Sequence, residues 1–436
     1  MKNRSDLGEF IHYIVPNVLG MVGLSCYILA DTFFVSQSMG SDGLTALNLA
    51  IPVYSFIHGT GLMLGMGGAT RYTILKTQGE GESAQRVYTH TLGLGAIFAI
   101  FFFLLGLLGS DSLTRFLGAD AAVYGMTKTY LRVLLLFSPL FLLNDITLPF
   151  VRNDGAPRLA MCGLMGSSFS NIILDYLFMF PLNMGIFGAV LATSIAPAIS
   201  LAVSAPFFLQ KRNSFHPVQC SFRPHTARSI LTLGLPSLVT EVSAGVVMIV
   251  FNTILLSLRG NLAVAAYGVV SNLALVVTAI YTGIAQGVQP LMSRHYGAGQ
   301  PERAAKLLRY ALNAALGVSA AVYLLVFLGA EPIAALFNRA GDPQLQSMAV
   351  QGLRIYFTCC FCTGVNVVLS TFFTSMERSR PANTMSILRG LAVVVPMAYL
   401  LASLGGMTGL WCAVTVTEVL VALLGGRFYR KPAKQP

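Results

Sequence analysis

The feature that most restricts the fold of this chain is a series of twelve apolar runs, each long enough to cross a membrane. A helix needs about 20 apolar residues to span the hydrocarbon layer. The runs lack the alternating pattern of β-barrel strands, the only other architecture that spans a bilayer. The sequence therefore predicts an all-α integral membrane protein with twelve transmembrane helices near residues 10–36, 45–74, 87–109, 127–150, 158–181, 186–210, 228–257, 263–293, 304–329, 346–374, 382–404 and 407–428.

The charged residues support this assignment and orient the chain. They make up only 10% of the sequence, whereas a soluble domain carries about 25%. With the N-terminus inside the cell, 22 of the 28 Lys and Arg residues fall on the cytoplasmic side. The opposite side receives only Arg115, Lys128, Arg132, Arg259, Arg339 and Arg354. This positive-inside bias predicts that both termini are cytoplasmic. It also explains the net charge of +11 without a nucleic acid partner. The first apolar run is too long for a signal peptide, so we expect no cleavable signal.

The polar stretch near the middle of the chain divides the predicted helices into two groups of six. We expect an N-lobe at residues 1–212, a cytoplasmic linker at 213–227 and a C-lobe at 228–436. Sequence echoes support a duplication: Gly65, Gly79 and Gly81 recur 218 positions later as Gly283, Gly297 and Gly299. Two six-helix bundles with parallel pseudo-symmetry are typical of transporters that alternate access around a shared cavity.

Ionisable residues inside predicted spans are costly and indicate function. Asp31 and Asp175 both lie about 5–7 residues from the outer ends of outward-running helices, which places both carboxylates roughly 8–10 Å below those ends. Thr193 falls at a similar depth, and Asn171 shares a helix face with Asp175. Two carboxylates, an amide and a hydroxyl at one level can bind a proton or coordinate Na⁺. An alternative is that neighbouring groups simply satisfy each acid.

The second half offers a weaker set of candidates. Glu241 could bind a cationic substrate, couple an ion or hold helix packing, and Asn366 is the polar residue of the tenth span. Pro16 and Pro236 are placed to bend their helices. Asp145 and Glu418 lie near predicted span ends, where capping or snorkelling is expected. The Cys359-Cys360-Phe361-Cys362 run lacks nearby His or carboxylate ligands, so no metal site is expected.

Several motifs together resemble the multidrug and toxic compound extrusion (MATE) family, in its MepA-like bacterial branch. They are Ala30–Val35, Gly43–Asn48, Gly61–Thr70, Arg152–Pro157, Gln289–Pro290 and Tyr296–Gly299. The resemblance implies a two-lobed exporter of the bacterial cytoplasmic (inner) membrane. It would exchange H⁺ or Na⁺ for cationic drugs or dyes, without a further cofactor.

The same resemblance implies roles for particular residues. Asp31, Asn171, Asp175 and Thr193 match the family's N-lobe cation site, Pro16 matches a helix-bending proline, and Glu241 matches the acid of the seventh span. An aspartate found in the tenth span of some members is missing here, which moves the expected ion site to the N-lobe. We expect the protein to act in the lipid bilayer as a monomer.

Two other functions compete with an exporter. A flippase for lipid-linked oligosaccharides or precursors would need a basic central cavity, whereas the basic residues concentrate at the cytoplasmic edge. An intramembrane enzyme would need a catalytic pair or a metal cluster within the spans. The six histidines are scattered, mostly at predicted span ends: His12, His58, His90, His216, His225 and His295. We therefore expect no enzymatic activity.

Overall fold

The structure is a computed structural model that describes residues 5–338 and 341–430. Every regular element within these ranges is a helix. Five basic residues used in the topology prediction lie outside the described residues, namely Lys2, Arg4, Arg339, Lys431 and Lys434.

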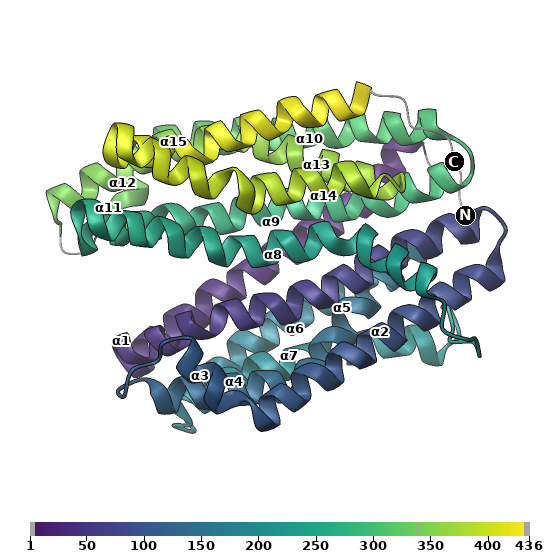
Figure 1. Ribbon diagram of the computed structural model, residues 1–436, viewed down its shortest axis with the longest axis horizontal. Coiled ribbons are helices and arrows are strands. Elements are labelled where there is room, and N and C mark those ends of the chain that lie inside the picture. The colour runs from purple at the N-terminus through teal and green to yellow at the C-terminus, as the bar shows by residue number, and fades with distance from the viewer. Residues whose placement is uncertain (1–4, 339–340, 431–436) are drawn as a thin grey trace.

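The helices form two groups that lie side by side and follow the order of the chain (Figure 1). The first group is α1 (Asp6–Thr77), α2 (Gly81–Leu108), α3 (Ser110–Phe116), α4 (Tyr124–Leu136), α5 (Ser138–Asn153), α6 (Pro157–Met179) and α7 (Gly185–Leu209). We call it the N-half. Two of its hydrophobic clusters hold α1, α2, α4, α5 and α7 together.

The second group, the C-half, begins with α8 (Pro224–Arg259), α9 (Asn261–Gly297), α10 (Pro301–Leu328) and α11 (Ala330–Phe337). It continues with α12 (Pro343–Tyr356), the 3₁₀ turn η1 (Phe357–Cys359), α13 (Cys360–Ser375), α14 (Ser379–Ile387), the π-helical segment η2 (Leu388–Ala392) and α15 (Val394–Arg430). One large apolar cluster fills it, and Phe10, Tyr13 and Ile14 of α1 join that cluster. The start of α1 therefore packs on both halves.

The twelve predicted spans can be traced in these elements. Eight helical stretches in the described ranges are long and apolar enough to cross a membrane, and α4 with α5 forms a ninth that bends by 49°. Non-helical backbone at Gly40 divides α1 into two spans. Gly406 likewise divides α15 into a first part, which completes the span that begins with α14, and a second part, which is the last span. With α6 as the remaining span, the chain crosses twelve times.

The two halves repeat the same sequence of elements. Gly40 (φ 61°, ψ −146°) and Gly260 (φ 69°, ψ −158°) turn the chain between the first two spans of each half with nearly the same backbone angles. Only glycine adopts this region readily, because a Cβ atom would clash. A 28-residue helix follows in each half, α2 and α10, and then a short helix, α3 and α11. The pattern confirms two pseudo-symmetric six-helix bundles.

The halves meet most closely where α1 crosses α8. A Cβ added to Gly67 would lie 2.0 Å from the carbonyl oxygen of Ile230, and one added to Gly234 would lie 1.7 Å from that of Met63. Backbone therefore faces backbone at this crossing, as small residues allow in membrane helices. Val18 of α1 approaches Gly283 of α9 in the same manner.

Polar bonds between the halves gather at the end that carries both termini. Arg294 of α9 bonds Glu9 of α1 at 2.6 Å, and Arg71 of α1 pairs with Glu377, which follows α13. A little deeper, the Gln289 amide of α9 donates to the Thr70 hydroxyl at 2.6 Å. We call this region the termini end. The halves are closed against each other there.

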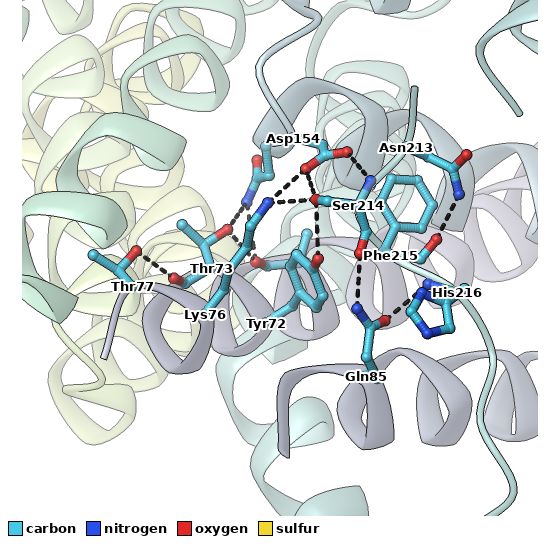
Figure 2. A network of polar contacts seen from close by, with 12 residues as sticks. Tyr72, Thr73, Lys76, Thr77, Gln85, Asp154, Asn213, Ser214, Phe215 and His216 are labelled. Atoms are coloured by element: carbon cyan, nitrogen blue, oxygen red, sulfur yellow. Dashed lines mark hydrogen bonds and ion pairs between the residues drawn. The ribbon is translucent and has the colours of Figure 1, made fainter. Parts of the chain in front are cut away.

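The connection between α7 and α8 is docked on the N-half rather than extended between the halves. Figure 2 shows its central polar contacts. The Asp154 carboxylate accepts from the Ser214 backbone N–H at 2.7 Å and from the Lys76 ammonium at 2.8 Å. Gln85 of α2 donates to the Ser214 carbonyl and accepts from the His216 N–H. The predicted linker, 213–227, is shorter in the structure, since α8 already begins at Pro224.

An aromatic cluster in the N-half also holds the connection between α7 and α8. Phe215 is fully buried and lies 4.9 Å, centroid to centroid, from Tyr88 and 5.4 Å from Phe150. The edge-on arrangement of Phe215 and Tyr88 is a favoured one for aromatic pairs. The connection is held on the N-half up to its last residue, since the Arg223 N–H donates to His90 Nε2 of α2 at 2.8 Å.

Candidate functional site

The four polar residues predicted for the N-half are all buried inside it. Asp31 lies on the first span of α1, Asn171 and Asp175 lie on α6, and Thr193 lies on α7. Asp175 and Asn171 have no exposed surface, and Asp31 and Thr193 are 7% and 5% exposed. Asp31 and Asp175 are close enough to repel each other electrostatically. The structure thus brings the predicted residues to one place.

Asn171 connects the two neighbouring helices of this cluster. In the amide orientation that gives both of its polar atoms a partner, Asn171 donates to Asp175 Oδ2 at 3.0 Å, and its oxygen accepts from the Thr193 backbone N–H at 3.1 Å. The i, i+4 spacing puts Asn171 and Asp175 on one helix face. Asn171 therefore holds the carboxylate in a fixed position against α7.

Each of the two carboxylates has a buried oxygen atom without a hydrogen-bond partner in the described part of the chain. Among the described residues, neither Asp31 Oδ1 nor Asp175 Oδ1 has a hydrogen-bond partner. An ionised carboxylate buried without a partner is strongly unfavourable. The pair is therefore suited to take up a proton or a small cation, which would satisfy these oxygens.

Tyrosine hydroxyls extend the cluster towards the centre of the protein. Tyr27 lies one helical turn before Asp31 and interacts with it electrostatically. Its hydroxyl lies 3.0 Å from that of Tyr54 on the second span of α1. Tyr130 of α4 is buried in the apolar cluster that also contains Met179 of α6 and Val190 of α7. Sequence reasoning missed these tyrosines, because nothing in their spacing distinguishes them from packing residues.

A second buried cluster was also missed. His58 Nδ1 lies 2.8 Å from Asp145 Oδ2, with side-chain exposures of 15% and 6%. Asn144 donates to the other oxygen of Asp145 at 3.3 Å. The expectation that Asp145 caps or snorkels at a span end is wrong, because Asp145 is buried where α5 packs against Gly61 of α1.

Glu241 and Asn366, the candidates of the C-half, belong to different clusters. Glu241 of α8 interacts electrostatically with His58 and Asp145 of the N-half. Asn366 of α13 instead donates to Glu418 Oε2 of α15 at 2.6 Å. The structure therefore does not join Glu241 and Asn366 in one site.

Glu418 and Arg389 form a buried ion pair next to Asn366. Arg389 donates to Glu418 Oε1 at 2.9 Å, and both side chains are at most 14% exposed. The expectations that Glu418 lies at a span end and Arg389 at the cytoplasmic surface are thus wrong. Arg389 sits in the π-helical segment η2, and its neutralisation by Glu418 permits it to remain inside the protein. A cavity of about 120 Å³ adjoins the pair, lined also by Tyr281 and Thr363.

The two proline candidates lie inside continuous helices. Pro16 and Pro236 are buried in α1 and α8, which remain helical on both sides of them. Each lacks an N–H, so the carbonyl four residues earlier loses its helical partner. Bending at these residues stays a prediction.

The sequence also matches a known family over most of its length. The family model for MatE matches residues 16–177 and 236–400, one segment in each half. The chain belongs to the MatE family. Asp31, Asn171 and Asp175 lie in the first MatE segment, and Glu241 and Asn366 lie in the second.

Curated relatives cover nearly the whole chain. The multidrug export protein MepA of Staphylococcus saprophyticus is 25% identical over 415 residues, which are 95% of this chain and 91% of that protein. MepA of Staphylococcus aureus is 26% identical over 416 residues, with the same coverage.

Solved MATE structures have the same fold. A crystal structure of a MATE protein in complex with MaL6 aligns with a TM-score of 0.92 at 24% identity, over 98% of this chain and 96% of that one. An outward-facing multidrug resistance MATE transporter aligns with a TM-score of 0.91 at the same identity and coverage. The twelve-helix, two-lobed fold of the MatE family is therefore confirmed for this chain.

Proposed function

We propose that this protein is a secondary active multidrug exporter that expels organic cations in exchange for H⁺ or Na⁺. The MatE family match supports this function. So do the relatives that align with this chain over 91% of their own length, which are named multidrug export proteins. The observation that carries the ion-coupling part is the buried Asp31–Asp175 pair, in which each carboxylate keeps an oxygen without a partner. The proposal assigns the protein no catalytic activity.

Alternating access follows from the way the two halves meet. Polar bonds and backbone contacts close the termini end. If both termini are cytoplasmic, as the charge bias predicts, this conformation opens to the outside. An ion can shift the equilibrium between outward and inward states only by its difference in affinity for the two. Asp31 is on α1, which contacts both halves, so occupation of its site can be transmitted to the interface between them.

The same proposal covers the membrane location, the oligomeric state and the substrates of the protein. The protein would lie in the cytoplasmic membrane of a bacterium, cross it twelve times and work as a monomer among lipids. Cationic drugs or dyes would bind between the halves before release to the outside. Flipping of lipid-linked precursors is not favoured, because the curated relatives that match nearly the whole chain are multidrug export proteins.

Transport in proteoliposomes tests the function. Purified protein would be reconstituted, and ethidium movement followed while a pH gradient or a Na⁺ gradient is imposed separately. We expect one gradient to drive transport and Asp31→Asn or Asp175→Asn to abolish it with normal expression. Asp42→Asn, which changes an exposed carboxylate beside the Gly40 turn between the first two spans, is the control. Normal transport by both site variants would contradict the coupling mechanism, and absence of transport by the wild type would contradict the exporter.

A further inference from the structure

The cluster of His58, Asp145 and Glu241 lies between the two halves and is separate from the Asp31–Asp175 pair. His58 is on the second span of α1, Asp145 is on α5 and Glu241 is on α8. Since an ionised carboxylate only accepts hydrogen bonds, the Nδ1 of His58 must donate to Asp145 Oδ2 across 2.8 Å. This bond fixes the ring and leaves its second nitrogen free to gain or lose a proton.

Glu241 faces this pair from the opposite half. A Cβ added to Gly59, the neighbour of His58, would lie 3.1 Å from Glu241 Cβ. The helices α1 and α8 therefore approach closely enough to set Glu241 within electrostatic range of His58 and Asp145. The approach lies farther from the closed termini end than the crossing of Gly67 and Gly234. His58 is 15% exposed on its side chain and Glu241 is partly exposed, so neither side chain is fully enclosed.

The charges of the cluster do not balance. Two carboxylates face a single imidazole, so negative charge is left over even when the ring is protonated. The uncharged neighbours include Asn144, which donates to Asp145, and Tyr54, whose ring stacks on that of His58 at 5.7 Å and 12°. Among the described residues, no lysine or arginine interacts with His58 or Glu241. Uncompensated negative charge with an aromatic wall suits a monovalent organic cation.

We propose that His58, Asp145 and Glu241 bind the organic cation and that a proton on His58 competes with it. This inference rests on the proposed export function and names the substrate site within it. When the cation binds, the imidazolium releases one proton to water from its second nitrogen, and its Nδ1–H remains bonded to Asp145. When the proton returns, the ring regains its positive charge and repels the cation. One proton therefore leaves the site for each monovalent organic cation that binds.

Tyr54 and Tyr27 lie between the proposed cation site and the Asp31–Asp175 pair. Tyr54 stacks on His58 and shares a hydrogen bond of 3.0 Å with Tyr27, which interacts with Asp31. Two uncharged side chains, Tyr54 and Tyr27, therefore lie between the imidazole and Asp31. The two sites can be tested independently.

Equilibrium binding of tetraphenylphosphonium to the purified full-length protein, between pH 6 and 8.5, tests the proposal. For competition with one proton, we expect affinity to fall up to about tenfold per pH unit on acidification. His58→Gln keeps a hydrogen-bond donor for Asp145 but cannot titrate, so its binding should no longer depend on pH. His90→Gln is the matched control, since His90 is a buried histidine of α2 that bonds the backbone of Arg223. Unchanged pH dependence in His58→Gln would overturn the proposal.

A second variant covers the case in which His58→Gln does not fold. Glu241→Gln removes one negative charge and should weaken tetraphenylphosphonium binding about tenfold at every pH, with its pH dependence retained. Unweakened binding by this variant would contradict the site. Asp31→Asn separates the proposals, because it should stop gradient-driven transport and leave pH-dependent binding intact. If Asp31→Asn removes the pH dependence and His58→Gln keeps it, the exporter stands and the competing proton belongs to Asp31.

Discussion

The guanidinium of Arg152 on α5 donates a hydrogen bond of 2.8 Å to the side-chain oxygen of Gln286 on α9, across the boundary between the halves. Arg152 is 3% exposed. It also donates to Asn17 Oδ1 at 2.7 Å and to Met66 Sδ at 3.2 Å. All three partners are uncharged. A buried cation held by neutral acceptors alone depends strongly on each of them.

Gln286→Leu should therefore loosen the closed termini end. The loss of a hydrogen bond to a charged group costs about 1.5–3 kcal/mol, which corresponds to about 10- to 100-fold in the equilibrium between closed and open arrangements. Spin labels at the exposed residues Gln78 and Gln300, one in each half, would report this change as a longer distance in double electron–electron resonance. Gln351→Leu is the control, because Gln351 bonds Thr408 within the C-half. An unchanged distance distribution in Gln286→Leu would show that Arg152 does not hold the closure.

Asp154→Ala should release the connection between α7 and α8. The Asp154 carboxylate is nearly buried and holds both the Ser214 N–H and the Lys76 ammonium. Its loss leaves those donors without their acceptor, at a cost of about 1–3 kcal/mol. We expect trypsin to cut after Lys211 and Arg212 about tenfold faster, as measured by mass spectrometry of the fragments. Asp120→Ala, which removes a cap in the loop between α3 and α4, should leave this rate unchanged.

Asn171→Leu and Thr193→Val should differ in their effects on transport. The Asn171 oxygen accepts from the backbone N–H of Thr193, so the Thr193 hydroxyl is not needed to hold it. We expect gradient-driven ethidium transport to fall at least about tenfold in Asn171→Leu, since the Asp175 carboxylate loses its donor. Thr193→Val should stay within about threefold of the wild type. The reverse order would assign the coupling role to the hydroxyl.

Glu418→Gln should destabilise the C-half. Removal of one partner from a buried ion pair leaves the other charge uncompensated and costs about 3–5 kcal/mol. Thermal unfolding in detergent, followed by the emission of the single tryptophan, Trp411, would measure this. The double variant with Arg389→Gln should recover part of the loss. Glu331→Gln, in an exposed pair with Arg354, should change little. Equal stability of Glu418→Gln and the wild type would contradict a structural role for the pair.

The spans could be predicted from the sequence because the requirement for apolar length acts on each segment separately. The breaks at Gly40 and Gly406 fall between predicted spans, at 36–45 and 404–407. The grouping of Asp31, Asn171, Asp175 and Thr193 was also accessible, since straight helices of known direction fix the depth of each residue. Their role in coupling stays a prediction.

The remaining clusters could not be predicted, because their partners are distant in sequence and their depth depends on helix irregularities. Asp145 meets His58, 87 residues earlier, and its burial depends on the packing of α1 against that face of α5, which the depth of a residue along one helix does not predict. Arg389 lies in a π-helical segment, which shifts the register of the residues that follow.

The contact of Gly67 and Gly234 with the backbones of α8 and α1 has a mechanical consequence. Most helix interfaces interlock through side chains, and those side chains must disengage before one helix can turn on the other. At this crossing the surfaces are nearly smooth, since glycine presents no side chain to engage. The two halves can therefore rotate relative to each other at this crossing with little steric resistance. A bulky residue in place of Gly67 or Gly234 would push α1 and α8 apart. It would slow the transport cycle even with every ion-binding and cation-binding group intact.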